Sequence, residues 1–365
     1  MMYDVVIVGA GPAGCTLARL LKDRSVLLVD TRNIAAPAGE CPEKCCGGLL
    51  APDARELLDR MGLAVPVEIL DSDQPLGVRA IDLASGKSRF YPRRYTNLDR
   101  AAFERWLLSL VGDNVRFLHG YRFRGMKPLA GGGWEVALSG SGGNETVHAA
   151  MVVGADGANS VVRRSLGEGP RRKTTYVAVQ DCFPLDPEQM SVPGNRREYA
   201  AFFDPAITDF YGWVIPKRDR LLLGVALPTG AKSRGPVPLL MDRTRRALEE
   251  KGYVFSGSPT RQGALLLRPG PGDVFTGRPG AWCVGEAAGF ISPSSAEGYS
   301  YAFASARVLA NAMAKYPDRD RIDRAYRAGV RPLLRNLIWK QIKSVVMFSP
   351  TLRSLVMASG VLSAK

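Results

Sequence analysis

The sequence has few of the residues from which metal sites are built. Its 365 residues include only two histidines, His119 and His148, and neither stands at a metal-ligand spacing. Of the six cysteines, Cys41, Cys45 and Cys46 lie close together, but no matching second half follows them, so we expect no metal site. With 46% hydrophobic residues, a chain of this length can bury a sizeable core without a disulfide framework.

Long apolar runs are also missing. No stretch reaches the roughly 18 apolar residues that a transmembrane helix needs, so we expect none. The first predicted core strand begins at Tyr3, and we expect no secretory signal. Both expectations indicate a cytoplasmic protein.

The sequence has fewer acidic than basic residues. It contains 35 Asp and Glu and 49 Lys and Arg, which give a formal net charge of +14. Such a balance can favour nucleic acid, an anionic membrane surface or an acidic substrate. The basic residues form short scattered groups, such as Arg93-Arg94 and Arg243–Arg246, without interleaved aromatic residues. Proteins that bind nucleic acid gather such residues on one face, so we predict a basic solvated surface and no nucleic-acid partner.

What the sequence does contain is a βαβ opening with a glycine-rich turn. Tyr3–Val8 is predicted to be a strand, and Gly9-Ala10-Gly11-Pro12-Ala13-Gly14 leads into a helix that we expect to end at Leu21. A second apolar strand, Val26–Val29, ends in Asp30. This is the spacing of a dinucleotide-binding fold.

Each conserved position of that turn type has a physical role. Gly9 permits the tight turn, Gly11 lets the backbone approach a pyrophosphate, and Gly14 lets helix and strand pack closely. The phosphates would lie at the positive end of the helix dipole. Asp30 stands where a carboxylate can accept hydrogen bonds from a ribose diol, so we predict a dinucleotide site.

Two further strands end in glycine-rich boxes, at Gly154-Ala155-Asp156-Gly157 and Gly285-Glu286-Ala287-Ala288-Gly289. Ligands of α/β sheets bind outside the carboxyl ends of strands, so three such ends can converge on one ligand. Asp156 and Glu286 can each bond a hydroxyl of a large nucleotide. Taken singly, each is better explained as a cap or turn residue, but three such boxes in this order favour the ligand. A helix starting at Gly298 would direct its positive end at an anionic group, such as a reduced flavin.

The order of predicted elements indicates an α/β fold: a Rossmann-like nucleotide-binding domain assembled from discontinuous segments, an inserted mixed or antiparallel β-sheet substrate domain, and C-terminal helices. The expected ranges are 1–70, 96–173 and 269–317 for the first domain, 71–95 and 174–268 for the second, and 318–365 for the helical segment.

The three glycine boxes resemble those that hold one FAD in the p-hydroxybenzoate-hydroxylase-type flavoproteins, whose third box usually carries Asp where this chain has Glu286. Within that group the sequence is most similar to the geranylgeranyl reductase family, and there to its bacterial CbrA-type branch. Three more motifs carry this resemblance: Lys44-Cys45-Cys46-Gly47-Gly48, Tyr211-Gly212-Trp213-Val214-Ile215-Pro216, and Ile291-Ser292-Pro293 through Glu297-Gly298.

The resemblance implies FAD as the cofactor and assigns roles to individual residues. Those implied to bind FAD are Gly9, Gly11, Pro12, Ala13, Gly14, Asp30, Thr31, Gly47, Gly48, Arg100, Asp156, Gly285, Glu286, Ala287 and Gly298. Those implied to line the substrate cavity are Tyr211, Trp213 and Pro293, although the two aromatic residues fit a plain sheet core equally well.

Cys46 is the candidate catalytic residue, because the resemblance places it beside the flavin, where a thiol can donate a proton. The alternative is a small buried hydrophobe, which free cysteine usually is. A disulfide between Cys45 and Cys46 would be strained.

The leading functional hypothesis is reduction of carbon–carbon double bonds in an isoprenoid or other small hydrophobic substrate, with NADPH, ferredoxin or another electron donor. An aromatic monooxygenase of the same fold and a non-catalytic flavin-bearing lipid-binding protein are the alternatives. The basic amphipathic segment from Arg331 to Met357 indicates either contact with the inner face of the membrane or a helical cap on the substrate domain.

Overall fold

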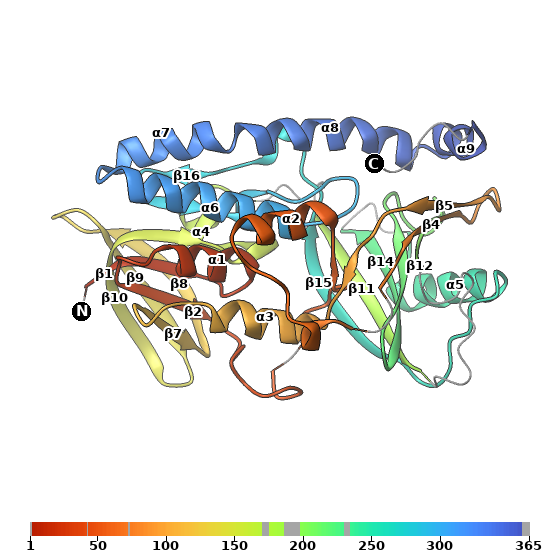
Figure 1. Ribbon diagram of the computed structural model, residues 1–365, viewed down its shortest axis with the longest axis horizontal. Helices are drawn as coiled ribbons and strands as arrows, with labels where there is room; N and C mark the ends of the chain where they lie inside the picture. Colours follow the sequence, from red (N-terminus) through yellow and green to blue (C-terminus); the bar gives the residue numbers. More distant parts are fainter. Residues whose placement is uncertain are drawn as a thin grey trace. The chain divides into compact units, whose positions relative to one another are not determined.

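The computed structural model describes residues 2–41, 43–71, 74–169, 175–185, 198–229 and 234–359 (Figure 1). The chain divides into two compact units. Unit 1 comprises Met1–Glu43, Ala101–Arg171 and Leu267–Lys340, and unit 2 comprises Lys44–Arg100, Arg172–Leu266 and Gln341–Lys365. The domain boundaries expected from the sequence differ from these and stay a prediction; the boundary between 173 and 174 lies outside the described residues.

Unit 1 is built on an eight-stranded sheet whose main path runs β16-β17-β10-β1-β2-β7. Strand β1 pairs in parallel with β10 and β2, and β10 pairs in parallel with β17. Their apolar residues are buried, as the near-continuous hydrophobic runs of a covered parallel sheet predict. The bounds are β1 Met2–Val8, β2 Val26–Asp30, β7 Val115–His119, β8 Tyr121–Pro128, β9 Trp134–Gly140, β10 Gly143–Gly154, β16 Gly277–Arg278 and β17 Ala281–Cys283.

The register of this sheet aligns the three glycine boxes. Val8 of β1 is the partner of Gly154 in β10, and Gly154 is the partner of Cys283 in β17. The first box begins at Gly9, directly after Val8, the second begins at Gly154 itself, and the third begins at Gly285, two residues after Cys283. The three strand ends therefore lie side by side at one edge of the sheet, as the sequence predicted.

Helices cover this sheet and pack on one another. Helix α1 packs against β1 and β2, α6 packs against α1, and α7 packs against α6 (Figure 1). The α6 helix is 17 residues long, and most of its buried side chains are small or apolar. The bounds are α1 Pro12–Leu20, α3 Arg100–Ser109, α4 Val161–Ser165, α6 Tyr299–Lys315 and α7 Arg319–Gly329.

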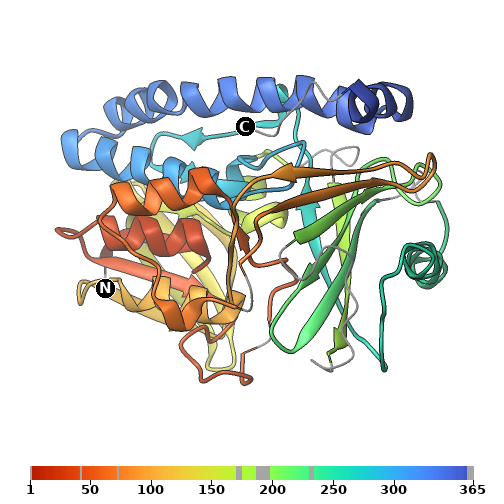
Figure 2. The same cartoon turned by 45° about the vertical axis from the view of Figure 1, so that its right-hand side comes forward.

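Unit 2 contains a seven-stranded sheet in the order β15-β11-β14-β13-β12-β4-β5, visible edge-on in Figure 2. The pairs β11–β14, β14–β13, β13–β12 and β4–β5 are antiparallel, whereas β12–β4 is parallel, so the sheet is mixed. The bounds are β4 Gly77–Asp82, β5 Ser88–Pro92, β11 Thr175–Pro184, β12 Glu198–Phe203, β13 Gly212–Pro216, β14 Arg220–Pro228 and β15 Thr260–Leu267.

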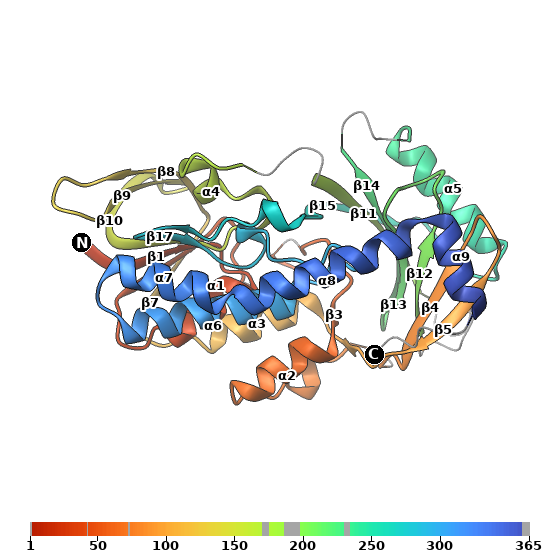
Figure 3. The same cartoon turned by 90° about the horizontal axis from the view of Figure 1, so that it is seen from above.

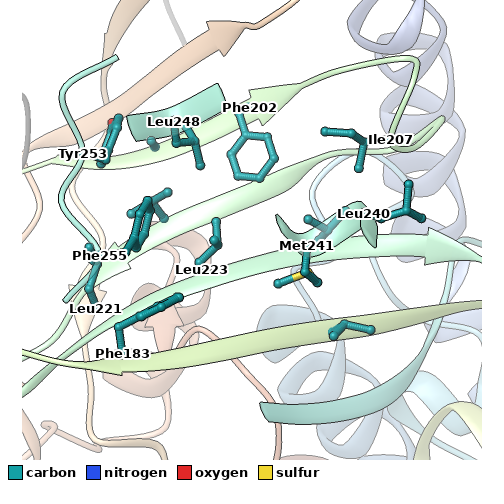
Figure 4. Packing of buried hydrophobic residues seen from close by; sticks show 14 of the residues in the cluster. Phe183, Phe202, Ile207, Leu221, Leu223, Leu240, Met241, Leu248, Tyr253 and Phe255 are labelled. Atoms are coloured by element: carbon teal, nitrogen blue, oxygen red, sulfur yellow. The ribbon is translucent and has the colours of Figure 1, made fainter. Parts of the chain in front are cut away.

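One face of this sheet buries a hydrophobic core under helix α5, Val237–Glu249 (Figure 4). Phe183, Phe202 and Leu223 of the strands share this core with Leu248 of the helix. A separate two-stranded sheet pairs β3, Leu49–Leu50, with β6, Thr96–Asn97, and helix α2, Pro52–Arg60, follows β3. The predicted α/β fold class with an inserted mixed sheet is confirmed.

Two helices close the described chain: α8, Arg331–Phe348, and α9, Pro350–Ser359 (Figure 3). Helix α8 is continuous, although its residues up to Lys340 group with unit 1 and the rest with unit 2. Within unit 2, Arg353 of α9 forms an ion pair of 2.9 Å with Asp82 of β4, and both side chains are buried. Among the helices that the structure describes, none is long and apolar enough to cross a membrane.

Candidate functional site

In the first glycine box, side chains added at Gly9 or Gly14 would collide with the backbone, whereas one added at Gly11 would not. Gly9 has a φ of +102°, and a Cβ there would lie 2.5 Å from the carbonyl oxygen of Ala155. A Cβ on Gly14 would lie 1.8 Å from the carbonyl oxygen of Gly9. A Cβ on Gly11 would meet no described atom within 4 Å, so this side of the loop is open for a ligand. Pro12 occupies the first turn of α1, where it costs no hydrogen bond.

Asp30 fixes the same loop from the end of β2. Its Oδ2 accepts a 2.8 Å hydrogen bond from the Ala10 amide, and its Oδ1 accepts one of 2.8 Å from the Arg32 amide. Each carboxylate oxygen keeps a second lone pair, which a ribose hydroxyl can use. Thr31, between the two, is exposed. Arg32 donates to the buried Glu104 of α3 at 2.9 Å, a partner that the sequence did not indicate.

In the second box, Asp156 takes the capping role that the sequence left open and keeps one oxygen for the other. Its Oδ2 accepts the amides of Val161 and Val162 at 2.7 and 3.2 Å and so caps α4. Its Oδ1 is buried and has no hydrogen-bond partner in the described part of the chain. Burial raises the pKa of this carboxyl, while the Ser160 hydroxyl and the two amides favour its ionised form. A buried acceptor of this kind suits a ligand hydroxyl.

The third box is tied to the second and to α6. The Val284 amide donates to the Gly154 carbonyl at 2.9 Å, and the Gly285 amide donates to Ser305 Oγ of α6 at 2.9 Å. Gly285 and Gly289 both have positive φ, at +57° and +87°. Oε1 of Glu286 accepts the Leu267 amide at 3.0 Å, so its carboxylate already supports the backbone. Ala287 is buried.

A tight turn leads from this box into α6. The Ser292 amide donates to the Glu297 carbonyl and the Ala296 amide to the Ser292 carbonyl, both at 3.0 Å. Ala296 has a φ of +53°, and no other non-glycine residue in the described ranges has a positive φ. Such backbone strain clusters at ligand sites. Pro293 is buried in this turn, and Gly298 is the N-cap of α6.

Comparison with known proteins identifies the family of this chain. The FAD binding domain family matches residues 2–190. The chain belongs to this family. The curated relatives include Protein CbrA of Escherichia coli O6:H1, strain CFT073, which is 36% identical over 98% of this chain and 94% of its own length. Protein CbrA of Shigella sonnei, strain Ss046, is also 36% identical, over 98% of this chain and 97% of its own length.

Solved structures share the fold. A geranylgeranyl bacteriochlorophyll reductase-like protein from Thermoplasma acidophilum superimposes with a TM-score of 0.78 at 19% identity, over 100% of this chain and 93% of that one. The anhydrotetracycline hydroxylase OxyS from Streptomyces rimosus gives 0.68 at 19% identity, over 98% and 72%. PqsL of Pseudomonas aeruginosa, a probable FAD-dependent monooxygenase, gives 0.68 at 19% identity, over 98% and 100%.

FAD is the cofactor of this oxidoreductase, and the glycine boxes of unit 1 fit it. The open backbone at Gly11 suits a pyrophosphate, the Asp30 carboxylate suits a ribose, and the unsatisfied Oδ1 of Asp156 suits another hydroxyl. No group of three or more candidate metal ligands occurs among the described residues. The contacts of individual residues with FAD stay predictions.

In unit 2, the Tyr211–Pro216 motif comprises β13 and the residue before it, and its aromatic rings lie in a row with Phe210. Trp213 is 9% exposed, and its indole Nε1 donates to Oε1 of the buried Gln180 at 3.0 Å. The Trp213 ring lies 5.9 Å from that of Tyr211, which lies 4.8 Å from that of Phe210. A Cβ on Gly224 of β14 would lie 2.1 Å from the indole, so this glycine makes room for it. Neither Gln180 nor Gly224 was predicted from the sequence as part of this site.

Also in unit 2, the Cys46-Gly47-Gly48 segment lies against a buried lysine. Lys217 follows β13, and its Nζ would be 2.8 Å from a Cβ on Gly48. It donates to Oδ1 of Asn97 at 2.6 Å and to the carbonyl of Leu98 at 2.9 Å. Burial lowers the pKa of Lys217, opposed by the nearby Asp71 carboxylate and by Cys46. The sequence feature that could have indicated this residue is the position of Lys217 directly after the Tyr211–Pro216 motif.

The two adjacent cysteines differ in their surroundings. Both are free thiols, so the strained disulfide is not formed. Cys45 lies 3.9 Å from the carbonyl of Ala178, and burial raises the pKa of its thiol to about 12. Cys46 Sγ accepts the Gly48 amide at 3.5 Å. Arg100 is half-buried at the start of α3. Contact of Cys46, Gly47, Gly48 or Arg100 with the cofactor stays a prediction.

Proposed function

We propose that this FAD-dependent oxidoreductase reduces carbon–carbon double bonds of an isoprenoid lipid. The observation that carries the proposal is the row of aromatic rings in unit 2. Phe348, Phe210, Tyr211 and Trp213 follow one another with centroid distances of 5.0, 4.8 and 5.9 Å. Phe210 and Trp213 are buried, whereas Tyr211 and Phe348 are partly exposed, so a hydrocarbon chain would bury its apolar surface against the latter two rings.

Different residues of this chain would have different roles in such a reaction. When bound in reduced form, FAD can supply a hydride to an acceptor or react with dioxygen. The Gln180 amide holds the Trp213 indole in one orientation, which keeps the aromatic surface rigid and excludes water from it. The Cys46 thiol is the candidate donor of the proton that balances hydride addition to a double bond.

The motifs support a reductase over other chemistries of this fold. Lys44–Gly48 and Tyr211–Pro216 resemble those of the geranylgeranyl reductase family, and the reductase-like structure covers the full chain with a TM-score of 0.78. The hydroxylase and monooxygenase structures superimpose with TM-scores of 0.68.

The test is anaerobic reduction of the FAD-loaded protein with dithionite, followed by polyprenyl lipids of several lengths and headgroups. We expect flavin reoxidation and a product heavier by two hydrogens per reduced bond. Unchanged reoxidation rates and unchanged lipid masses across all these lipids would refute the proposal. Cys46→Ala should slow product formation while leaving the bound-flavin absorbance intact.

The second candidate function is aromatic hydroxylation, favoured by the likeness to the two oxygenase structures. In that case an aromatic compound would stimulate both NADPH consumption and dioxygen uptake. Tight lipid binding with slow flavin reduction by NADPH, ferredoxin and dithionite would instead favour a non-catalytic flavin-bearing lipid-binding protein.

A further inference from the structure

We propose that the outward face of helix α8 docks on an anionic phospholipid bilayer. This surface, the α8 outer face, consists of Ile338, Trp339, Ile342 and Val345. Their exposed fractions are 43%, 71%, 54% and 60%. Single exposed hydrophobic residues are ordinary, but four within two turns of one helix form a patch that marks an interaction site.

The helix already has a separate packing face. Leu337 and Ser344, seven residues apart, are both buried, and the Phe348 ring lies 5.0 Å from that of Phe210. On a helix with 3.6 residues per turn, residues at intervals of three, four and seven share a face. Ile338, Ile342 and Val345 follow these intervals on the other side. The α8 outer face is therefore not the side by which α8 packs on its own chain.

The charged residues from Arg324 onward are all basic, and of these Arg327, Lys340 and Arg353 form ion pairs with Asp323, Glu297 and Asp82. From Arg324 to the end of the sequence there is no Asp or Glu, whereas Arg or Lys stands at 324, 327, 331, 335, 340, 343, 353 and 365. Arg331 and Arg335 are exposed, precede Ile338 and Ile342 at helical spacing, and form no ion pair with a residue that the structure describes. A basic flank beside an apolar stripe is complementary to anionic lipid headgroups over hydrocarbon.

The exposed apolar residues and the neighbouring arginines together favour a bilayer over other binding partners. Two copies meeting through this face would bring arginines of like sign together without an acidic partner. Nucleic acid would satisfy the arginines but leave four apolar side chains against phosphates. A bilayer interface satisfies both, and Trp339, the most exposed of the four, is the residue type that membrane interfaces favour.

Helix α9 extends the same pattern within unit 2. Leu352 and Leu355 are 42% and 61% exposed, while Arg353 between them is held inward by Asp82. The buried ion pair fixes which side of α9 faces out, so its leucines stay available to lipid.

The experiment is flotation of the FAD-loaded protein with vesicles that contain no isoprenoid, so its outcome is independent of the proposed reaction. One vesicle preparation is pure phosphatidylcholine, and the other is an equimolar mixture with phosphatidylglycerol. We expect binding to the anionic vesicles that salt weakens. Trp339→Gln with Ile342→Gln and Val345→Gln should lower the partition coefficient at least about tenfold. Arg331→Gln or Arg335→Gln should lower it by about fivefold each, on anionic vesicles alone.

The matched control substitutes exposed apolar residues elsewhere. Val67 and Leu239 are 78% and 67% exposed, and Val67→Gln with Leu239→Gln should leave binding unchanged. Unaltered flavin absorbance and unfolding temperature would show that each variant is folded. The proposal is overturned if the triple variant binds like the parent, if neutral vesicles bind equally well, or if light scattering shows that the triple variant only splits a dimer. It is equally overturned if a DNA duplex binds and anionic vesicles do not.

Discussion

The ammonium of Lys217 lies 2.6 Å from Oδ1 of Asn97, and both side chains are buried in unit 2. The same nitrogen bonds the Leu98 carbonyl and lies 3.7 Å from the Asp71 carboxylate. One cation thus joins the end of β13 to the strand β6, which in turn pairs with the segment after Gly48. Lysine is among the residues least often buried, so this arrangement has consequences for stability.

Replacing Lys217 by methionine should destabilise the protein by about 1–3 kcal/mol, because two buried acceptors lose their donor. Denaturant unfolding followed by tryptophan fluorescence measures the change. The matched control is Lys22→Met, at an exposed lysine outside this network, which should change the free energy of unfolding by no more than about 0.5 kcal/mol. Equal effects of the two substitutions would contradict a role for the buried cation.

The same residue predicts a pH dependence of definite sign. Burial lowers the pKa of Lys217 in the folded state below its ordinary value of 10.5. Between the lowered pKa and 10.5, the unfolded chain binds more protons than the folded one, so stability rises with pH. The free energy of unfolding of the parent minus that of Lys217→Met should therefore increase as pH rises toward 10.5 and level off beyond it. A difference that falls over this range would refute the assignment.

Alanine substitutions at Gly11 and Gly14 should distinguish an effect on cofactor binding from an effect on folding. A Cβ on Gly14 would overlap the Gly9 carbonyl, so Gly14→Ala should destabilise the apoprotein and abolish FAD binding. A Cβ on Gly11 meets no described atom within 4 Å, so Gly11→Ala should leave apoprotein stability unchanged. It should nevertheless weaken FAD binding by about tenfold or more, because the methyl group would occupy the approach of the pyrophosphate. Flavin fluorescence titration and thermal unfolding of the apoproteins measure both; unchanged affinity in Gly11→Ala would show that the phosphates lie elsewhere.

The ion pair between Arg353 and Asp82 should hold α9 on the sheet of unit 2. Arg353→Leu leaves a buried carboxylate unpaired and should cost about 3–5 kcal/mol, whereas the double substitution with Asp82→Leu should recover part of this loss. Hydrogen exchange of the α9 amides should accelerate in Arg353→Leu and less so in the double variant. Unaltered exchange in the single variant would mean that other contacts hold the helix.

Local sequence patterns predicted the elements and the edge at which the glycine boxes meet. Continuous apolar runs ending in glycine indicated buried parallel strands, and the observed register of Val8, Gly154 and Cys283 follows from them. The amphipathic pattern of Asn97–Val111 predicts a helix over that range, but α3 begins only at Arg100, because Thr96 and Asn97 pair with Leu50 and Leu49. That pairing joins residues far apart in the sequence, and the local amphipathic pattern carries no trace of it.

The partners of the candidate site residues were likewise beyond local patterns. Gln180 lies 33 positions from the indole that it bonds, and Lys217 lies 120 positions from Asn97. A glutamine in a strand and a lysine after one are usually solvated, and only the fold shows that these two are buried. The capping role expected for Asp156 is observed at Oδ2, whereas a bond from its Oδ1 to a ligand hydroxyl stays a prediction.

The contact between Trp213 and Gly224 limits how this protein can have diverged. An alanine at position 224 would overlap the indole, so the glycine can change only after the tryptophan has become smaller. Conversely, a smaller residue at 213 would leave a void beside Gly224 that a larger neighbour can fill. The two positions should therefore co-vary among homologues. The pair of residues found at 213 and 224 in each homologue would show in which branches of the family the shape of this aromatic surface has changed.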